Sequence, residues 1–204
     1  MKAQVDAGKK ISLLVDIAYI DFAGEKNSTR AFMKKFSDLP ENLFVMIAFS
    51  MSKSFTFYGQ RTGALIGISS NEKIIDEFKD VCKYSNRAVW SNINRGAQAL
   101  LVKLNSDKDL QAVYEAERNE LYQTVKRRAD VFVEEAKSCG LRIVPYKGGF
   151  FIAVPAENPA AVCQKLRDDL IFAVPLKLGI RVAACSISFE KMHGVAEKIL
   201  RAMK

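Results

Sequence analysis

The stretch that decides the fold is Phe49–Gly67, which reads F-S-M-S-K-S-F-T-F-Y-G-Q-R-T-G-A-L-I-G. The apolar run Leu43–Phe49 leads into it and Ala64–Ile68 leads out, and both are typical of buried strands. Between them, a glycine-containing turn carries several hydroxyls and two cations, Lys53 and Arg61. Because α/β sheets bind ligands where core strands end, the stretch predicts a ligand site at this turn. The alternative is an ordinary loop with solvated charges.

The composition is that of a soluble globular protein, with 49% apolar and 26% charged residues among 204. The net charge is +8, but the basic residues are interleaved with acids, which argues for a general preference for anions and against a nucleic-acid partner. We expect no membrane partner, because no apolar run is long enough to span a membrane and the first residues lack the apolar stretch of a signal peptide.

Four cysteines without a C-x-x-C pair and a single histidine narrow the chemistry further. Widely spaced cysteines indicate free thiols in a reduced, cytoplasmic setting, and we expect no metal site. One histidine, His193, cannot supply a histidine-rich metal site, and a surface position near a helix start is the simplest interpretation. Catalysis would therefore depend on lysine, tyrosine, aspartate and arginine.

The first part of the chain reads as α/β. The apolar residues 11–15 predict a strand that ends at Asp16, and Tyr19 follows three residues later. Thr29–Leu39 predicts a short helix closed by Pro40. The strand therefore delivers a carboxylate and a phenol to its carboxyl end.

From residue 70 the pattern becomes helical. Asp107–Cys139 is the longest periodic run, and Gly140 is placed as its stop. Unbroken, it would be about 50 Å long, and a helix of that length commonly connects two bodies. We therefore predict three parts: a sheet-containing part in residues 1–105, a connecting helix in residues 106–140, and a small α+β domain in residues 141–204.

The last part alternates strands and helices. Leu141–Tyr146 and Phe150–Val154 predict a hairpin around a glycine pair, and a second strand pair is expected in residues 172–176 and 180–185. Proline at the first helical position starts a helix at residue 159, and Ser188 is expected to cap one final helix that ends near Met203.

The residue types at the strand ends suit one cofactor. A lysine amine beside apolar strands, such as that of Lys53, attacks carbonyl groups. Two hydroxyls and a guanidinium suit a phosphate monoester, and these are supplied by Ser50, Ser52 and Arg61. Asp16 could hold a proton on a ring nitrogen and Tyr19 could donate to a ring oxygen. Together they predict a pyridoxal phosphate site.

Four motifs carry a family resemblance over essentially the whole chain. They are Asp16-Ile17-Ala18-Tyr19, Ser50-Met51-Ser52-Lys53, Tyr58-Gly59-Gln60-Arg61-Thr62-Gly63 and Trp90-Ser91-Asn92. In this order they resemble the D-x-A-Y, S-x-S-K, Y-x-x-R-x-G and W-S-N motifs of fold-type I, class I aminotransferases. The most similar branch is that of the aspartate and aromatic amino-acid aminotransferases. The resemblance implies the carboxyl-terminal half of such an enzyme, a homodimer when complete, with part of the large-domain sheet.

The resemblance also implies roles. Lys53 would bind pyridoxal phosphate covalently and move the proton, with Asp16 and Tyr19 as its catalytic partners, and Ser50, Ser52 and Arg61 holding the phosphate.

For the substrate, the resemblance implies that Arg181 binds the α-carboxylate in a pocket lined by Phe151. Arg87 would receive a distal carboxylate across a dimer, and Trp90 would also line the substrate site; without the resemblance, Arg87 reads as a solvated helix-end charge. The implied substrates are aspartate, glutamate or an aromatic amino acid, together with a 2-oxo acid such as 2-oxoglutarate.

Two departures leave a second hypothesis open. The segments that in the family complete the cofactor site have no counterpart here, and Ile93-Asn94 stands where the family has prolines. The chain is therefore expected to be either an aminotransferase, whole or in part, or a non-catalytic fragment that acts as a dimerisation or anion-binding module.

Overall fold

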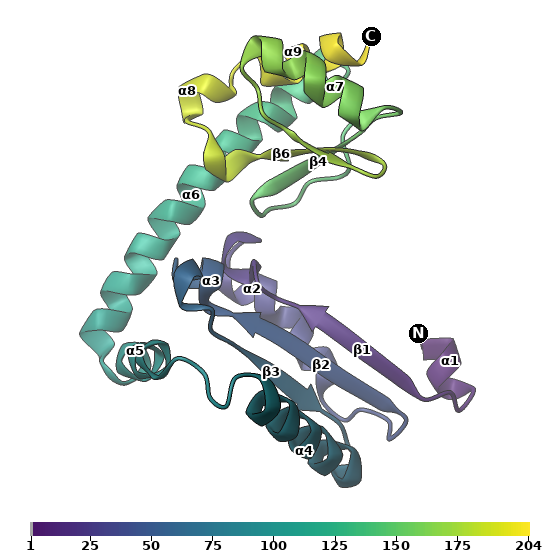
Figure 1. Cartoon of the computed structure of the whole chain (residues 1–204), viewed down its shortest axis with the longest axis vertical. Coiled ribbons are helices and arrows are strands. Elements are labelled where there is room, and N and C mark those ends of the chain that lie inside the picture. Colours follow the sequence, from purple (N-terminus) through teal and green to yellow (C-terminus); the bar gives the residue numbers. More distant parts are fainter. Residues whose placement is uncertain (1) are drawn as a thin grey trace. The chain divides into compact units, whose positions relative to one another are not determined.

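The computed structural model describes residues 2–204 and divides the chain into two compact units. The first unit comprises the residues up to Asp21 and Glu25–Arg118, and the second comprises Phe22–Gly24 and Asn119–Lys204. The long helix α6, Lys108–Cys139, begins one residue later than its periodicity predicts and ends where expected (Figure 1). The division into residues 1–105, 106–140 and 141–204 stays a prediction.

The first unit is built on a three-stranded sheet. Its strands are β1, Ile11–Asp16; β2, Leu43–Ser50; and β3, Gly63–Ile68, in the order β1-β2-β3 (Figure 1). β1 runs parallel to β2, and β3 runs antiparallel to it. Because Asp16 pairs with Ala48 and Ser50 pairs with Gly63, the ends of β1 and β2 and the start of β3 share one edge of the sheet.

Most of the helices in this unit are short. They are α1, Lys2–Asp6; η1, Ile20–Phe22; α2, Lys26–Arg30; η2, Ala31–Phe36; α3, Met51–Ser54; η3, Tyr58–Gln60; α4, Glu72–Val89; and α5, Arg95–Ser106. The predicted helix over residues 29–39 is wrong in its bounds. The Glu25 carboxylate accepts the amides of Asn27 and Ser28, so the helix begins earlier, and its second part tightens into a 3-10 helix.

The second unit contains an antiparallel sheet. Its strands are β4, Phe151–Pro155; β5, Val174–Leu176; and β6, Gly179–Ala183, in the order β4-β6-β5. The helices are α7, Pro159–Leu166; η4, Arg167–Asp169; η5, Ala184–Ser186; α8, Phe189–Met192; and α9, Val195–Met203. A contiguous core joins them to α6 and contains the fully buried side chains of Phe132, Ile152, Leu166, Ile180 and Ile199.

The predicted hairpin of residues 141–146 with 150–154 is wrong as a pair of strands. The amide of Val144 donates to the carbonyl of Ala153 at 2.9 Å, but residues 141–147 form no strand, and β4 pairs with β6 instead. The two glycines serve a close approach to an earlier segment of the same unit. The amide of Gly149 donates to the carbonyl of Phe22 at 2.8 Å, and a Cβ on Gly148 would lie 2.4 Å from the carbonyl oxygen of Ala23.

The predicted single final helix is also wrong, because it is interrupted at His193 and Gly194. Gly194 has φ +77°, a left-handed conformation that ends α8 before α9 starts. Glu135 of α6 accepts the Gly194 amide at 2.9 Å and contacts Nδ1 of His193 at 3.0 Å. His193 therefore lies between two helices, with a half-exposed side chain.

Candidate functional site

The shared edge of the first sheet brings together the six residues predicted to bind the cofactor. Asp16 ends β1 and Ser50 ends β2, while Arg61 precedes β3 by two residues. Tyr19 follows β1, and Ser52 and Lys53 lie in α3, which begins directly after β2. The parallel pairing of β1 with β2 therefore places a carboxylate, a phenol, hydroxyls and two cations at one edge.

The local sequence explains where Lys53 lies. The hydroxyl of Ser50 accepts the amide of Ser52 at 3.1 Å, so Ser50 caps the single turn of α3. The ammonium of Lys53 then lies 5.0 Å from the centroid of the Tyr19 ring and 5.2 Å from that of Tyr58. Because ring faces attract cations at such distances, the two phenols hold the lysine head between separate segments of the chain.

The guanidinium of Arg61 contacts both the Ser52 hydroxyl and the Tyr58 ring. Its Nη1 donates to Oγ of Ser52 at 3.4 Å and to the carbonyl of Tyr58 at 3.0 Å, and its guanidinium lies 4.7 Å from the Tyr58 ring centroid. A guanidinium with further N–H groups, next to serine hydroxyls that can still donate their own hydrogen, is a donor set for a phosphate monoester. With Lys53 for an aldehyde and exposed Asp16 for a ring nitrogen, these residues fit pyridoxal phosphate.

Arg181 and Phe151 meet in the second unit. They lie on the paired strands β6 and β4, and the guanidinium of Arg181 lies 4.3 Å from the Phe151 ring centroid. Nε of Arg181 is buried and has no hydrogen-bond partner among the described residues. Since buried donors are almost always paired, this atom is suited to an incoming carboxylate.

Arg87 and Trp90 lie at the carboxyl-terminal end of α4. Arg87 is exposed and hydrogen bonds to the hydroxyl of Ser91, and Trp90 is 75% exposed. No hydrogen bond or ring contact found in residues 2–204 joins either side chain to Lys53. Asn94, where the family has a proline, caps α5 by accepting the amide of Ala97 at 3.2 Å.

A buried charge network near the site was missed by the sequence reasoning. The carboxylate of Asp21, on a buried side chain, accepts from Arg30 at 2.5 Å and from Arg118 at 2.8 Å. Burial raises the pKa of Asp21, but the hydroxyl of Ser54 and the two guanidinium groups act the other way and hold that pKa below its ordinary value. The sequence feature that could have indicated this buried carboxylate is the position of Asp21 between the apolar residues Ile20 and Phe22.

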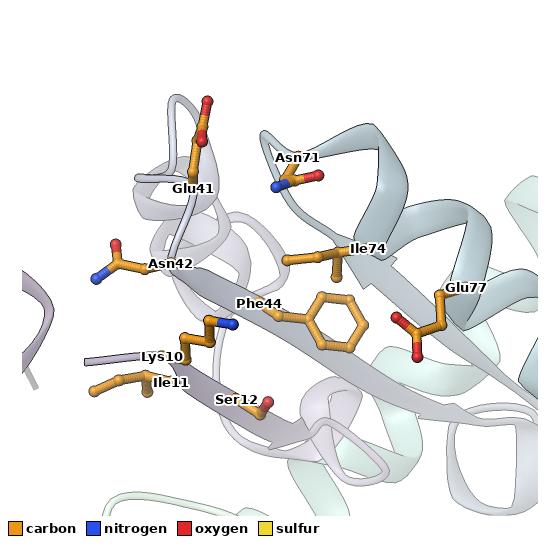
Figure 2. Close-up of a pocket in the computed structure, with 9 residues that line it drawn as sticks. All are labelled: Lys10, Ile11, Ser12, Glu41, Asn42, Phe44, Asn71, Ile74 and Glu77. Carbon is orange, nitrogen blue, oxygen red and sulfur yellow. The ribbon is translucent and has the colours of Figure 1, made fainter. Parts of the chain in front are cut away.

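A separate cavity lies at the opposite end of the first sheet, where β1 and β2 begin. Figure 2 shows Phe44 of β2 between the start of β1 and α4. The cavity has a volume of about 500 Å³. Its lining residues are Lys10, Ile11, Ser12, Glu41, Asn42, Phe44, Asn71, Ile74 and Glu77. None of these is a predicted site residue, so the candidate site is not this cavity.

In residues 2–204, no helix is long and apolar enough to cross a membrane. Within the same range, no group of three or more histidine, cysteine, aspartate or glutamate side chains is placed to hold a metal ion, and the four cysteines are free thiols.

Comparison with known proteins gives a consistent match. The family model described as aminotransferase class I and II matches residues 3–199. Aspartate aminotransferase of Escherichia coli strain K12 is 27% identical over 138 residues, which cover 68% of this chain and 34% of that protein. The Haemophilus influenzae aspartate aminotransferase is 26% identical over 196 residues, covering 93% of this chain and 48% of that protein.

Solved structures match over the whole chain. An aminotransferase from Anaerococcus prevotii superposes with a TM-score of 0.94 at 42% identity, covering 100% of this chain and 49% of that one. An aromatic-amino-acid aminotransferase from Burkholderia pseudomallei, covalently bound to pyridoxal phosphate, has a TM-score of 0.77 at 23% identity, covering 100% of this chain and 50% of that one. These matches confirm the predicted α/β fold class. The chain spans between a third and a half of the length of these relatives.

Proposed function

The chain belongs to the class I and II aminotransferase family, as its motifs predicted, and we propose that it contributes the lysine-bearing site of a pyridoxal-phosphate-dependent amino-acid aminotransferase. The observation that carries this proposal is the position of Lys53 between the Tyr19 and Tyr58 rings, next to the Ser52–Arg61 pair. The bound cofactor of the Burkholderia pseudomallei relative supports the same assignment.

Each residue at the sheet edge has a task in this proposal. Lys53 would supply the amine that holds the cofactor through its aldehyde, and the same amine, once released by the amino group of the substrate, would move the proton at the substrate α-carbon. Asp16 keeps a proton on the ring nitrogen, and Tyr19 donates to the ring oxygen. Ser50, Ser52 and Arg61 hold the phosphate through charge-assisted hydrogen bonds. Pyridoxal phosphate, when bound, supplies the electron sink for the bond broken at the α-carbon.

The substrate would be an amino acid with a 2-oxo acid as the acceptor. Arg181 binds the α-carboxylate with the buried Nε that has no hydrogen-bond partner in residues 2–204, and Phe151 packs on the same guanidinium. Arg87 and Trp90, exposed at the end of α4, are free to act across a homodimer of the complete enzyme. Aspartate, glutamate or an aromatic amino acid, exchanged with 2-oxoglutarate, is the proposed substrate class. A cytoplasmic location is part of the proposal; one relative, from Dictyostelium discoideum, is named as cytoplasmic.

The test is covalent capture of the cofactor. The purified chain is mixed with pyridoxal phosphate, reduced with borohydride and digested, and the modified peptides are mapped. We expect one pyridoxyl group per chain on Lys53 and little on exposed lysines such as Lys79. Lys53→Arg, which keeps the charge, is the control and should lose this label. A label absent from Lys53, or spread evenly over exposed lysines, would favour the non-catalytic dimerisation or anion-binding module.

A further inference from the structure

The helix that carries Lys53 cannot be stable alone. α3 has only four residues. In a single helical turn, the entropy lost by fixing the backbone dihedral angles outweighs the stabilisation from its hydrogen bonds. Its final carbonyls also need donors from outside the turn. The carbonyls of Met51 and Lys53 find them in the amides of Phe55 and Thr56, at 3.2 Å and 3.0 Å.

The carbonyl of Ser54 accepts a hydrogen bond from a residue that is distant in the sequence. Tyr114 of α6 donates its hydroxyl hydrogen to it at 2.8 Å, across 60 residues of sequence. The Tyr114 ring also stacks on Phe55, with centroids 4.9 Å apart and planes 8° from parallel. Burial raises the pKa of Tyr114 to about 12, so the hydroxyl stays a donor over the working pH range.

Arg118 lies one turn further along the same face of α6 and binds the segment that contains Tyr19 and Asp21. Residues four apart lie on the same side of a helix, so Tyr114 and Arg118 point together. Arg118 donates to Asp21 at 2.8 Å, and its side chain is 12% exposed. Asp21 follows Tyr19 by two residues, and Tyr19 is one of the two rings beside the Lys53 ammonium.

We propose that Tyr114 and Arg118 are positioning residues, which hold Lys53 opposite the Tyr19 ring by fixing both segments to one face of α6. Tyr114 acts on the lysine turn through the carbonyl of Ser54, and Arg118 acts on the tyrosine segment through Asp21. The inference rests on the proposed function only in giving Lys53 its task, since the contacts exist without a cofactor.

Tyr114→Phe tests the proposal, because it keeps the ring and its stack and removes only the hydroxyl. The matched control is Tyr146→Phe, in the second unit: Tyr146 also donates to a backbone carbonyl, that of Gly149 at 2.6 Å, and its pKa is also about 12. Hydrogen exchange is measured at the amides of Phe55 and Thr56. We expect Tyr114→Phe to speed their exchange about five-fold, the usual effect of one lost hydrogen bond, and the control to leave it unchanged.

A second readout follows the lysine itself. The chain without cofactor is methylated with formaldehyde and cyanoborohydride, and the rate at Lys53 is divided by the rate at exposed Lys79. In the parent chain, Lys53 is half-buried beside two rings, so this ratio should lie below one. Tyr114→Phe and Arg118→Lys should both move the ratio toward one, while Tyr146→Phe should not.

Each outcome decides the matter. A faster exchange of α3 together with a changed Lys53 ratio supports the positioning role. Faster exchange with an unchanged ratio would mean a purely structural contact and overturn it, as would identical behaviour of the Tyr114 and Tyr146 variants. Failure of the parent chain to capture pyridoxal phosphate on Lys53 would count against the proposed function alone, because the methylation readout needs no cofactor.

Discussion

Replacing Asp21 by asparagine should be the most damaging single-charge change in the first unit. The Asp21 side chain is 7% exposed and pairs with Arg118 at 12% and Arg30 at 32%. Removing one partner of a buried pair costs about 3 to 5 kcal/mol, because the remaining charge stays buried without compensation. The greater exposure of Arg30 lets water replace part of the loss, so we expect a cost of about 3 kcal/mol in the free energy of unfolding.

The assay is urea unfolding followed by hydrogen exchange at the amides of β1 and β2, with those of β4 and β6 as an internal reference. Asp76→Asn is the matched control, since Asp76 pairs with Lys79 at the surface, with both side chains about two-thirds exposed or more. That change should cost no more than about 0.5 kcal/mol. Equal effects of the two substitutions would refute the reasoning.

The pH dependence gives an independent check on Asp21. Its pKa is lower in the folded chain than in the unfolded chain, where it is about 4. The stabilisation is therefore present above pH 4 and is lost as the pH falls through the lower folded value. The parent should lose stability in acid more steeply than Asp21→Asn, and parallel acid curves would contradict the assigned network.

Two further predictions concern the second unit and alkaline pH. Phe132→Ala should cost about 3 to 5 kcal/mol and speed hydrogen exchange in β4 and β6, because Phe132 is fully buried in that core; Val81→Ala, at a 58% exposed position, is the control with little effect expected. Burial raises the pKa of Tyr114 and Tyr146 to about 12. The unfolded chain therefore releases these two protons near pH 10, whereas the folded chain keeps them. The free energy of unfolding should fall as the pH rises from 10 to 12. Thermal unfolding at pH 8 and pH 11 measures this loss, which should be smaller in Tyr146→Phe; a loss of the same size in that variant would argue against burial of the hydroxyl.

The elements that the sequence predicted well are those set by local pattern. Apolar runs located β1, β2 and β3, and the periodicity of residues 107–139 located α6 to within one residue. The candidate site residues followed from the same information, because Asp16 and Ser50 lie at the ends of predicted strands, and the parallel pairing of β1 with β2 brings these ends to one edge. The roles assigned to these residues stay predictions.

Apart from the helix bounds near Glu25, which a local cap decides, the failures have one physical cause: distant residues decide a local choice. The pair Gly148-Gly149 has the composition of a tight turn, yet Gly148 makes room for Ala23, more than a hundred residues earlier. The network of Asp21 with Arg118 joins residues 97 apart, so no periodicity could reveal it. The break at Gly194 likewise depends on Glu135, which lies on another helix.

The contact of Glu135 with Gly194 has a consequence for the order in which the second unit assembles. Gly194 has no side chain to cap α9, and its own amide, directly before that nine-residue helix, donates to a carboxylate 59 residues away. Helices this short are marginal in water by themselves, and the start of α9 gains this contact only once the last turns of α6 have formed. The end of the chain should therefore fold late, and α9 should open in the native state together with the carboxyl-terminal turns of α6, as one cooperative unit.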